Sequence, residues 1–148
     1  MQTFLPYPNF RRSVQALDNK RLGKQRVESF QLMCALGFGP ALNELIIRTG
    51  KSDLPRGWAN HPAAIMWDGY EYALAEYYNE SIDEWVRRGF NNTLNKIFLL
   101  ADYDYPEWFG DPKFHRSHKS NLLRKDPQYY GQFHWDVPHD LEYVWPTK

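Results

Sequence analysis

Apolar residues recur at three- and four-residue spacing along two long stretches of the chain, and this spacing is typical of an amphipathic α-helix. The first stretch predicts a helix over residues 13–36, which Gly37 ends. The second predicts a helix that begins at residues 60–62 and ends at Gly89, with Pro62 in its first turn, where the missing N–H costs nothing. Two long helices are therefore expected to form most of the core.

Shorter elements are expected around these helices. Residues 41–48 predict a short helix, and residues 51–59 read as a loop because they contain proline and glycine. Residues 92–101 predict either a further helix or a buried apolar segment. Asp111-Pro112 is a good helix start and predicts a helix over residues 114–124.

The rest of the chain is rich in aromatic residues and loops. Residues 103–145 hold eleven aromatic side chains, and no alternating strand pattern of convincing length occurs along the chain. The length of 148 residues suits one domain. We expect a mainly α fold over residues 1–148: a compact single-domain bundle of two long helices plus shorter helices, with a loop-rich aromatic C-terminal tail.

Composition narrows the class of protein. The single Cys34 excludes an internal disulfide and points to a reducing compartment. The sequence has no apolar run of about 20 residues and no signal peptide. We expect a cytoplasmic monomer with no membrane partner.

Charge is balanced overall, with 18 basic and 18 acidic residues, but it is unevenly distributed. Residues 68–84 contain six acids and no lysine or arginine, whereas residues 113–125 contain five basic residues and no acid. Residues 11–28 form a second basic block. Such blocks are compatible with a polyanion partner, although ordinary solvated helix faces would give the same pattern.

One cation interrupts the apolar face of the first helix. Arg26 shares this face with Leu22 and Phe30, so it is expected either to pair with a carboxylate of the acidic helix or to line a polar pocket with Asn19. Gly23 in mid-helix predicts the close approach of another backbone or a ligand.

Histidines and tyrosines supply further candidate chemistry. His115 and His118 are three residues apart and could hold a metal with His61, but the single cysteine makes this weak, and we expect no metal and no cofactor. Hydrogen bonds from these histidines to phosphates fit the neighbouring donors better. His61 could equally be a helix cap or a catalytic group. Tyr129 and Tyr130 beside the basic block could stack on unpaired bases or could pack the tail.

The whole chain carries stretches that resemble a known family. These stretches are residues 3–8, 17–28, 60–62, 66–70, 88–90, 115–127, 129–131 and 143–146. On them the chain resembles the phage-type pyrimidine-dimer DNA glycosylases, also called endonuclease V of the phage type, and more closely a bacterial and phage branch of that superfamily.

The resemblance implies a DNA-repair glycosylase with abasic-site lyase activity. In that family the N-terminal α-amine attacks C1′ of the damaged nucleotide and forms a Schiff base, a glutamate on the first helix assists, arginines hold phosphates, and a base is flipped out of double-stranded DNA. An α-amine suits this role because its ordinary pKa of about 7.7–8.0 leaves a useful fraction unprotonated at neutral pH.

The resemblance carries three catalytic residues over to this chain. Arg26 becomes the phosphate arginine and Glu28 the catalytic carboxylate, with Val27 between them where the family has the pair adjacent; the other register places Val27 at the acid's position. Because Gln2 follows Met1, the amine is that of Met1, unless Lys20 or Lys24 replaces it. The candidate DNA-binding residues are Asn19, Lys20, Arg21, Lys24, His61, His115, Arg116, His118, Lys119, Asn121, Arg124, Lys125, Tyr129 and Tyr130.

A second hypothesis needs no covalent chemistry. In it the protein is a non-catalytic DNA- or nucleotide-binding module. Its ligand would occupy a pocket formed by Asn19, Arg26, His61, His115 and His118. A metal-dependent nuclease is a third and weaker alternative.

Overall fold

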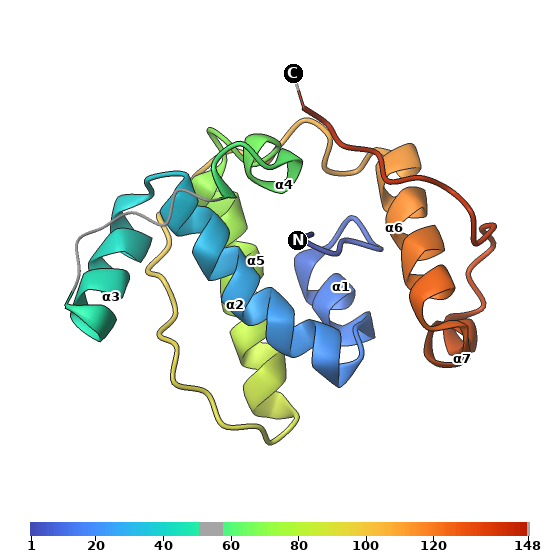
Figure 1. The fold of residues 1–148 in the computed structure, drawn as a ribbon, viewed down its shortest axis with the longest axis horizontal. Helices are drawn as coiled ribbons and strands as arrows, with labels where there is room; N and C mark the ends of the chain where they lie inside the picture. The colour runs from blue at the N-terminus through green and yellow to red at the C-terminus, as the bar shows by residue number, and fades with distance from the viewer. Residues whose placement is uncertain (51–57, 148) are drawn as a thin grey trace.

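The computed structural model describes residues 1–50 and 58–147, and it is helical with no strand in these ranges (Figure 1). The helices, in chain order, are α1 (Phe10–Ala16), α2 (Asn19–Ala35), α3 (Gly39–Thr49), α4 (Pro62–Ile65), α5 (Glu71–Arg87), α6 (Pro112–Lys125) and α7 (Pro127–Tyr130), followed by the 3-10 helix η2 (Gly131–Phe133). The prediction of a mainly α fold is confirmed. No single helix in the described ranges is long and apolar enough to cross a membrane; α2 and α3 meet that criterion only when taken together, across a bend of 111°.

Both long predicted helices are broken near their N-terminal ends. The helix predicted over residues 13–36 divides at Leu17, whose backbone is extended, because the carboxylate of Asp18 accepts the Arg21 N–H and starts α2 anew. The helix predicted from Pro62 divides where Gly69 takes a φ of +90° between α4 and α5. Its predicted end is confirmed, because α5 stops at Arg87, just before Gly89.

The shorter predictions mostly hold. Helix α3 covers residues 41–48, and α6 covers residues 114–124 with Asp111 as its N-cap, as predicted. Residues 92–101 are not helical. Ile97 is buried in this segment; its N–H donates to Asn79 Oδ1 and its carbonyl accepts from Asn79 Nδ2. Phe98, in contrast, is 88% exposed. Most of the predicted loop over residues 51–59 lies outside the described residues.

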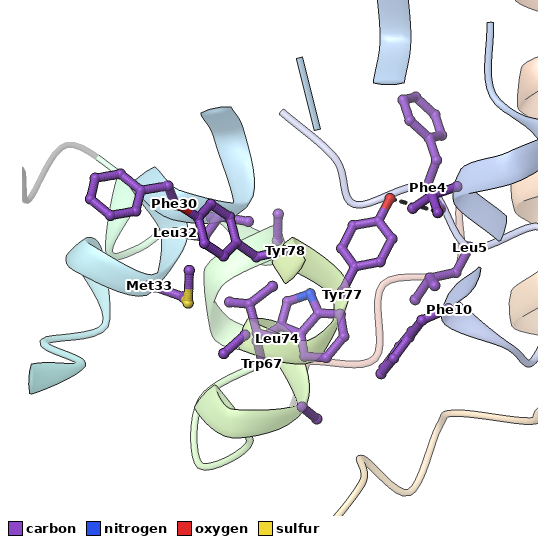
Figure 2. Packing of buried hydrophobic residues seen from close by; sticks show 14 of the residues in the cluster. Phe4, Leu5, Phe10, Phe30, Leu32, Met33, Trp67, Leu74, Tyr77 and Tyr78 are labelled. Atoms are coloured by element: carbon purple, nitrogen blue, oxygen red, sulfur yellow. Dashed lines mark hydrogen bonds between the residues drawn. The ribbon is translucent and has the colours of Figure 1, made fainter. Parts of the chain in front are cut away.

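The core forms where α2 packs on α5 (Figure 1). Figure 2 shows Trp67 and Tyr77 packed together, with Leu5 and Phe10 beside them and Phe30 with Tyr78 at the far end. Gly23 allows a close approach, but by a side chain and not by the backbone or ligand that was predicted: a Cβ there would lie 3.1 Å from the Trp85 ring. The two helices can therefore pack closely at this point.

The N-terminal segment lies inside the molecule, between the α2–α5 pair and α6 (Figure 1). Residues 2–6 are buried although they belong to no helix or sheet. Side chains of α2 and α5 therefore make the backbone hydrogen bonds that a neighbouring strand would make in a sheet. The Gln25 amide accepts the Phe4 N–H at 2.8 Å and donates to the Gln2 carbonyl at 2.7 Å, and the Tyr77 hydroxyl lies 2.8 Å from the Phe4 carbonyl.

Two histidines of α6 hold the same segment from the other side. His118 Nδ1 accepts the Leu5 N–H at 2.9 Å. His115 Nδ1 lies 2.7 Å from the Leu5 carbonyl, while its Nε2 accepts the Gly110 N–H at 2.9 Å. Both rings are neutral in this arrangement. Burial lowers the pKa of His115 and lowers that of His118 to about 3.

We predict that Gln25→Leu destabilises the protein by about 3 kcal/mol, because it leaves the Phe4 N–H and the Gln2 carbonyl buried without partners. Urea unfolding of this variant, compared with Gln15→Ala on the exposed side of α1, measures the loss. The control should change the free energy of unfolding by less than about 0.5 kcal/mol. Equal stability of Gln25→Leu and wild type would show that the amide does not hold the segment.

A second prediction concerns pH. Between pH 6.5 and 3 the unfolded chain protonates His118 but the folded protein does not, so stability is fully present above pH 6.5 and is lost as the pH falls. From pH 7.5 to pH 5 this group alone should remove about 2 kcal/mol from the free energy of unfolding. His118→Asn keeps an acceptor for the Leu5 N–H and should flatten the profile. An unchanged pH dependence in this variant would contradict the prediction.

Candidate active site

A pocket of about 400 Å³ opens where the start of the chain meets α2, α4 and the C-terminal segment. Its lining residues are Met1, Gln2, Phe4, Lys20, Arg21, Lys24, Glu28, His61, Lys125, Tyr143 and Trp145. Lys20, Lys24 and Glu28 occupy successive i, i+4 positions on α2, so they form one face of that helix. Met1, at the start of the buried N-terminal segment, lines the pocket together with this face of α2.

The charge of the pocket is mostly positive. Its lining holds four basic side chains and the amino terminus but a single carboxylate, that of Glu28. Arg21 is held in place by an ion pair with Asp18 at 3.1 Å. Although burial works to raise it, hydrogen bonds from Tyr130 and Arg21 keep the pKa of Asp18 below its usual value. The pocket therefore suits an anionic ligand such as a sugar-phosphate.

The pKa of His61 is affected by the charges of both the amino terminus and Glu28. It is the N-cap of α4, and its Nδ1 accepts the Ala63 N–H at 3.0 Å. Burial lowers the pKa of His61, the positive amino terminus lowers it further, and the negative Glu28 opposes both. The α-amine and the Glu28 carboxylate thus act on one ring in one pocket, which brings a primary amine and an acid–base group together.

Seven of the residues predicted as site residues meet in this pocket: Met1, Glu28, Lys20, Arg21, Lys24, His61 and Lys125. Arg26 does not. Its Nη1 donates to the Asn92 side chain at 2.8 Å, and its guanidinium lies 5.0 Å from the Trp85 ring. Among the described residues it pairs with no carboxylate, and it is not in the pocket around Met1, because its position on α2 faces the end of α5.

Asn19 is exposed, and its side-chain oxygen accepts a hydrogen bond from Arg88 at 2.9 Å. Arg88 also pairs with Glu84 of α5 at 2.7 Å, so it forms the bridge to the acidic helix that the sequence suggested for Arg26. Since His115 and His118 are occupied by Leu5, the ligand pocket proposed for Asn19, Arg26 and the three histidines does not form.

Four predicted DNA contacts are corrected to buried positions: His115, His118, Asn121 and Tyr130 are each at most 4% exposed. Asn121 donates to the Leu141 carbonyl at 3.0 Å, and Tyr130 bonds Asp18. Their side chains bond the N-terminal segment, the tail and the cap of α2 instead of facing solvent.

The remaining predicted contacts lie outside the pocket. Arg116 and Arg124 are exposed, and Lys119 is half-buried with its ammonium 5.1 Å from the Tyr7 ring. Tyr129 is half-buried near the Leu17 carbonyl. Arg116, Lys119 and Arg124 stay candidate DNA contacts by charge and Tyr129 by its ring, but none of them belongs to the group around Met1.

The sequence did not single out the apolar wall of the pocket. Phe4, Tyr143 and Trp145 form it, and the Trp145 ring lies 5.8 Å from that of His61. The signal available was the i, i+2 spacing of Tyr143 and Trp145, which places both side chains on one side of an extended segment. No group of three or more potential metal-ligating residues occurs in the part of the chain that the structure describes.

Comparison with known proteins gives one family. The family model described as pyrimidine dimer DNA glycosylase matches residues 1–98, which include Met1, Glu28 and His61. No curated protein and no solved structure matches the chain. Since the matched part covers about two thirds of the sequence and most of the pocket, the chain belongs to the pyrimidine dimer DNA glycosylase family.

Proposed function

We propose that the protein is a DNA glycosylase with abasic-site lyase activity and that the α-amine of Met1 is its nucleophile. The observation that carries the proposal is the pocket shared by Met1 and Glu28, in which both charges act on His61. The family supports the glycosylase activity and the DNA substrate. The amine nucleophile and the lyase step are what the resemblance to the phage-type enzymes implies, and the pocket that Met1 shares with Glu28 supports them.

The chemistry balances with these groups. The lone pair of the Met1 amine attacks C1′ of the damaged nucleotide as the N-glycosidic bond breaks, and the departing base takes the bonding electrons. The nitrogen then gives up one proton, the C1′–O4′ bond breaks as O4′ takes the bonding pair and that proton, and a protonated imine that keeps its last N–H remains at C1′. Removal of a proton from C2′ then expels the 3′-phosphate by β-elimination. In this proposal Glu28 accepts the amine proton, passes it to O4′, then takes the proton from C2′, and its negative charge stabilises the imine.

The rest of the pocket suits the substrate. Lys20, Lys24 and Lys125 can neutralise phosphates on either side of the reacting nucleotide. Tyr143 and Trp145 offer ring faces to a nucleotide that has left the base stack. Lys20 and Lys24 also line the pocket, so either amine is the alternative nucleophile.

The first test is borohydride trapping on duplexes that carry an abasic site, a pyrimidine dimer or no lesion, with the adduct mapped by mass spectrometry. We expect an adduct on Met1 with the first two duplexes. Glu28→Gln should lower the trapping rate by about 100-fold or more and leave DNA affinity unchanged, because it removes the acid–base group alone.

The matched control is Glu142→Gln, an exposed carboxylate of the tail that should trap at the wild-type rate. An adduct on Lys20 or Lys24 would show that this lysine, and not the amine of Met1, is the nucleophile. Wild-type trapping by Glu28→Gln would remove Glu28 from the mechanism.

The positive charge of the pocket gives a separate prediction. Lys24→Gln should weaken binding to DNA of any sequence and reduce the slope of log K against log[salt] by about 0.9, the value of one phosphate contact. The control is Lys96→Gln, which should leave the slope unchanged. The amine of Lys96 pairs with Asp83 on the surface of α5 at 3.2 Å. Equal slopes for Lys24→Gln and wild type would place the phosphates elsewhere.

A further inference from the structure

The two ring nitrogens of His61 have different surroundings. Nδ1 accepts the Ala63 N–H at the start of α4, at 3.0 Å, so its lone pair is in use. Nε2 has no hydrogen-bond partner among the described residues. It does not belong to the side-chain atoms that are both buried and without a partner. Because Nδ1 is the acceptor, the proton of the neutral ring resides on Nε2.

Two indole rings fix the orientation of this imidazole. The Trp58 ring centre lies 5.4 Å away with the planes at 75°, and the Trp145 ring centre lies 5.8 Å away at 83°. One indole precedes α4 and the other comes from the C-terminal segment. With Nδ1 tied to the helix and the ring held between two indoles, the imidazole has little freedom to turn.

The ring stays neutral at pH 7. Burial and the positive amino terminus hold the pKa of His61 below its ordinary value, and only Glu28 of α2 acts the other way. Lys24 of α2 and Lys125 at the end of α6 line the same pocket. A protonated His61 would also lose its bond to the Ala63 N–H, because Nδ1 would then be a donor.

We propose that His61 orients the reacting nucleotide as a neutral hydrogen-bond donor, with its Nε2–H directed to a deoxyribose or phosphate oxygen in the pocket. It takes no proton from the Met1 amine, because Nε2 already carries one and Nδ1 is occupied, and this leaves Glu28 as the base. The inference rests on the proposed function and adds to it a substrate-binding residue that belongs to neither the nucleophile nor the acid–base group.

Two substitutions of His61 test the roles of its two ring nitrogens separately. In His61→Asn the side-chain oxygen can replace Nδ1 as the cap of α4, since asparagine is a preferred N-cap, but nothing replaces Nε2–H. In His61→Gln the longer amide can bring an N–H close to the position of Nε2, and the cap is lost. A purely structural histidine would tolerate His61→Asn better, whereas a substrate donor would tolerate His61→Gln better.

The experiment measures affinity for a duplex with a tetrahydrofuran abasic site, which cannot form an imine, alongside the melting temperature. We expect His61→Asn to melt near the wild-type temperature and to bind the tetrahydrofuran duplex roughly five- to tenfold more weakly, the effect of one lost neutral hydrogen bond. His61→Gln should melt lower by about 3 °C and retain most of the affinity. His139→Asn, in the exposed tail, is the matched control and should change neither value.

The reverse order of affinities, or equal affinity of both variants and wild type, would overturn the inference. So would a wild-type protein that binds the tetrahydrofuran duplex no better than undamaged DNA. Failure of the proposed chemistry is a separate result: borohydride would then trap no adduct, while the difference between His61→Asn and His61→Gln in tetrahydrofuran binding would persist.

Discussion

Burial of the N-terminal segment is the constraint on which the site depends. An extended backbone without a neighbouring strand leaves its N–H and C=O groups unpaired, and each unpaired group costs free energy once water is excluded. Here Gln25 of α2 and the two histidines of α6 take the place of a strand. Residues 2–6 are therefore held inside the protein, and Met1 lines the same pocket as Glu28.

Charged side chains are also paired within the fold, most of all the acids of α5. The acids of α5 are used within their surroundings: Glu80 pairs with Arg11, Asp83 with Lys96, and Glu84 with two arginines. Glu76 accepts hydrogen bonds from two tyrosine hydroxyls. The cations on the pocket face of α2 have no comparable set of acids, so a chain of zero net charge presents a positive pocket.

The sequence predicted the elements better than the roles of their polar residues. Hydrophobic periodicity identifies the helical segments because burial of one face sets it, but it passes over local breaks such as Asp18, where a capping carboxylate competes with continuation of the helix. Arg26 was misplaced because its partner Asn92 comes from an irregular segment with no periodic signal. His115 and His118 looked like phosphate ligands because the sequence does not show that Leu5 lies between them and the core.

The pocket also crosses the boundary of the family match. Met1, Glu28 and His61 lie within residues 1–98, whereas Lys125, Tyr143 and Trp145 come from the part beyond it. The groups proposed as nucleophile and acid–base thus belong to the matched part, and two of the three residues of the apolar wall belong to the unmatched part. Trp145 joins the two, because its ring packs on His61 and so ties the orientation of a matched residue to the C-terminal segment. The pocket is therefore complete only when the C-terminal segment beyond residue 98 is folded against α2 and α4.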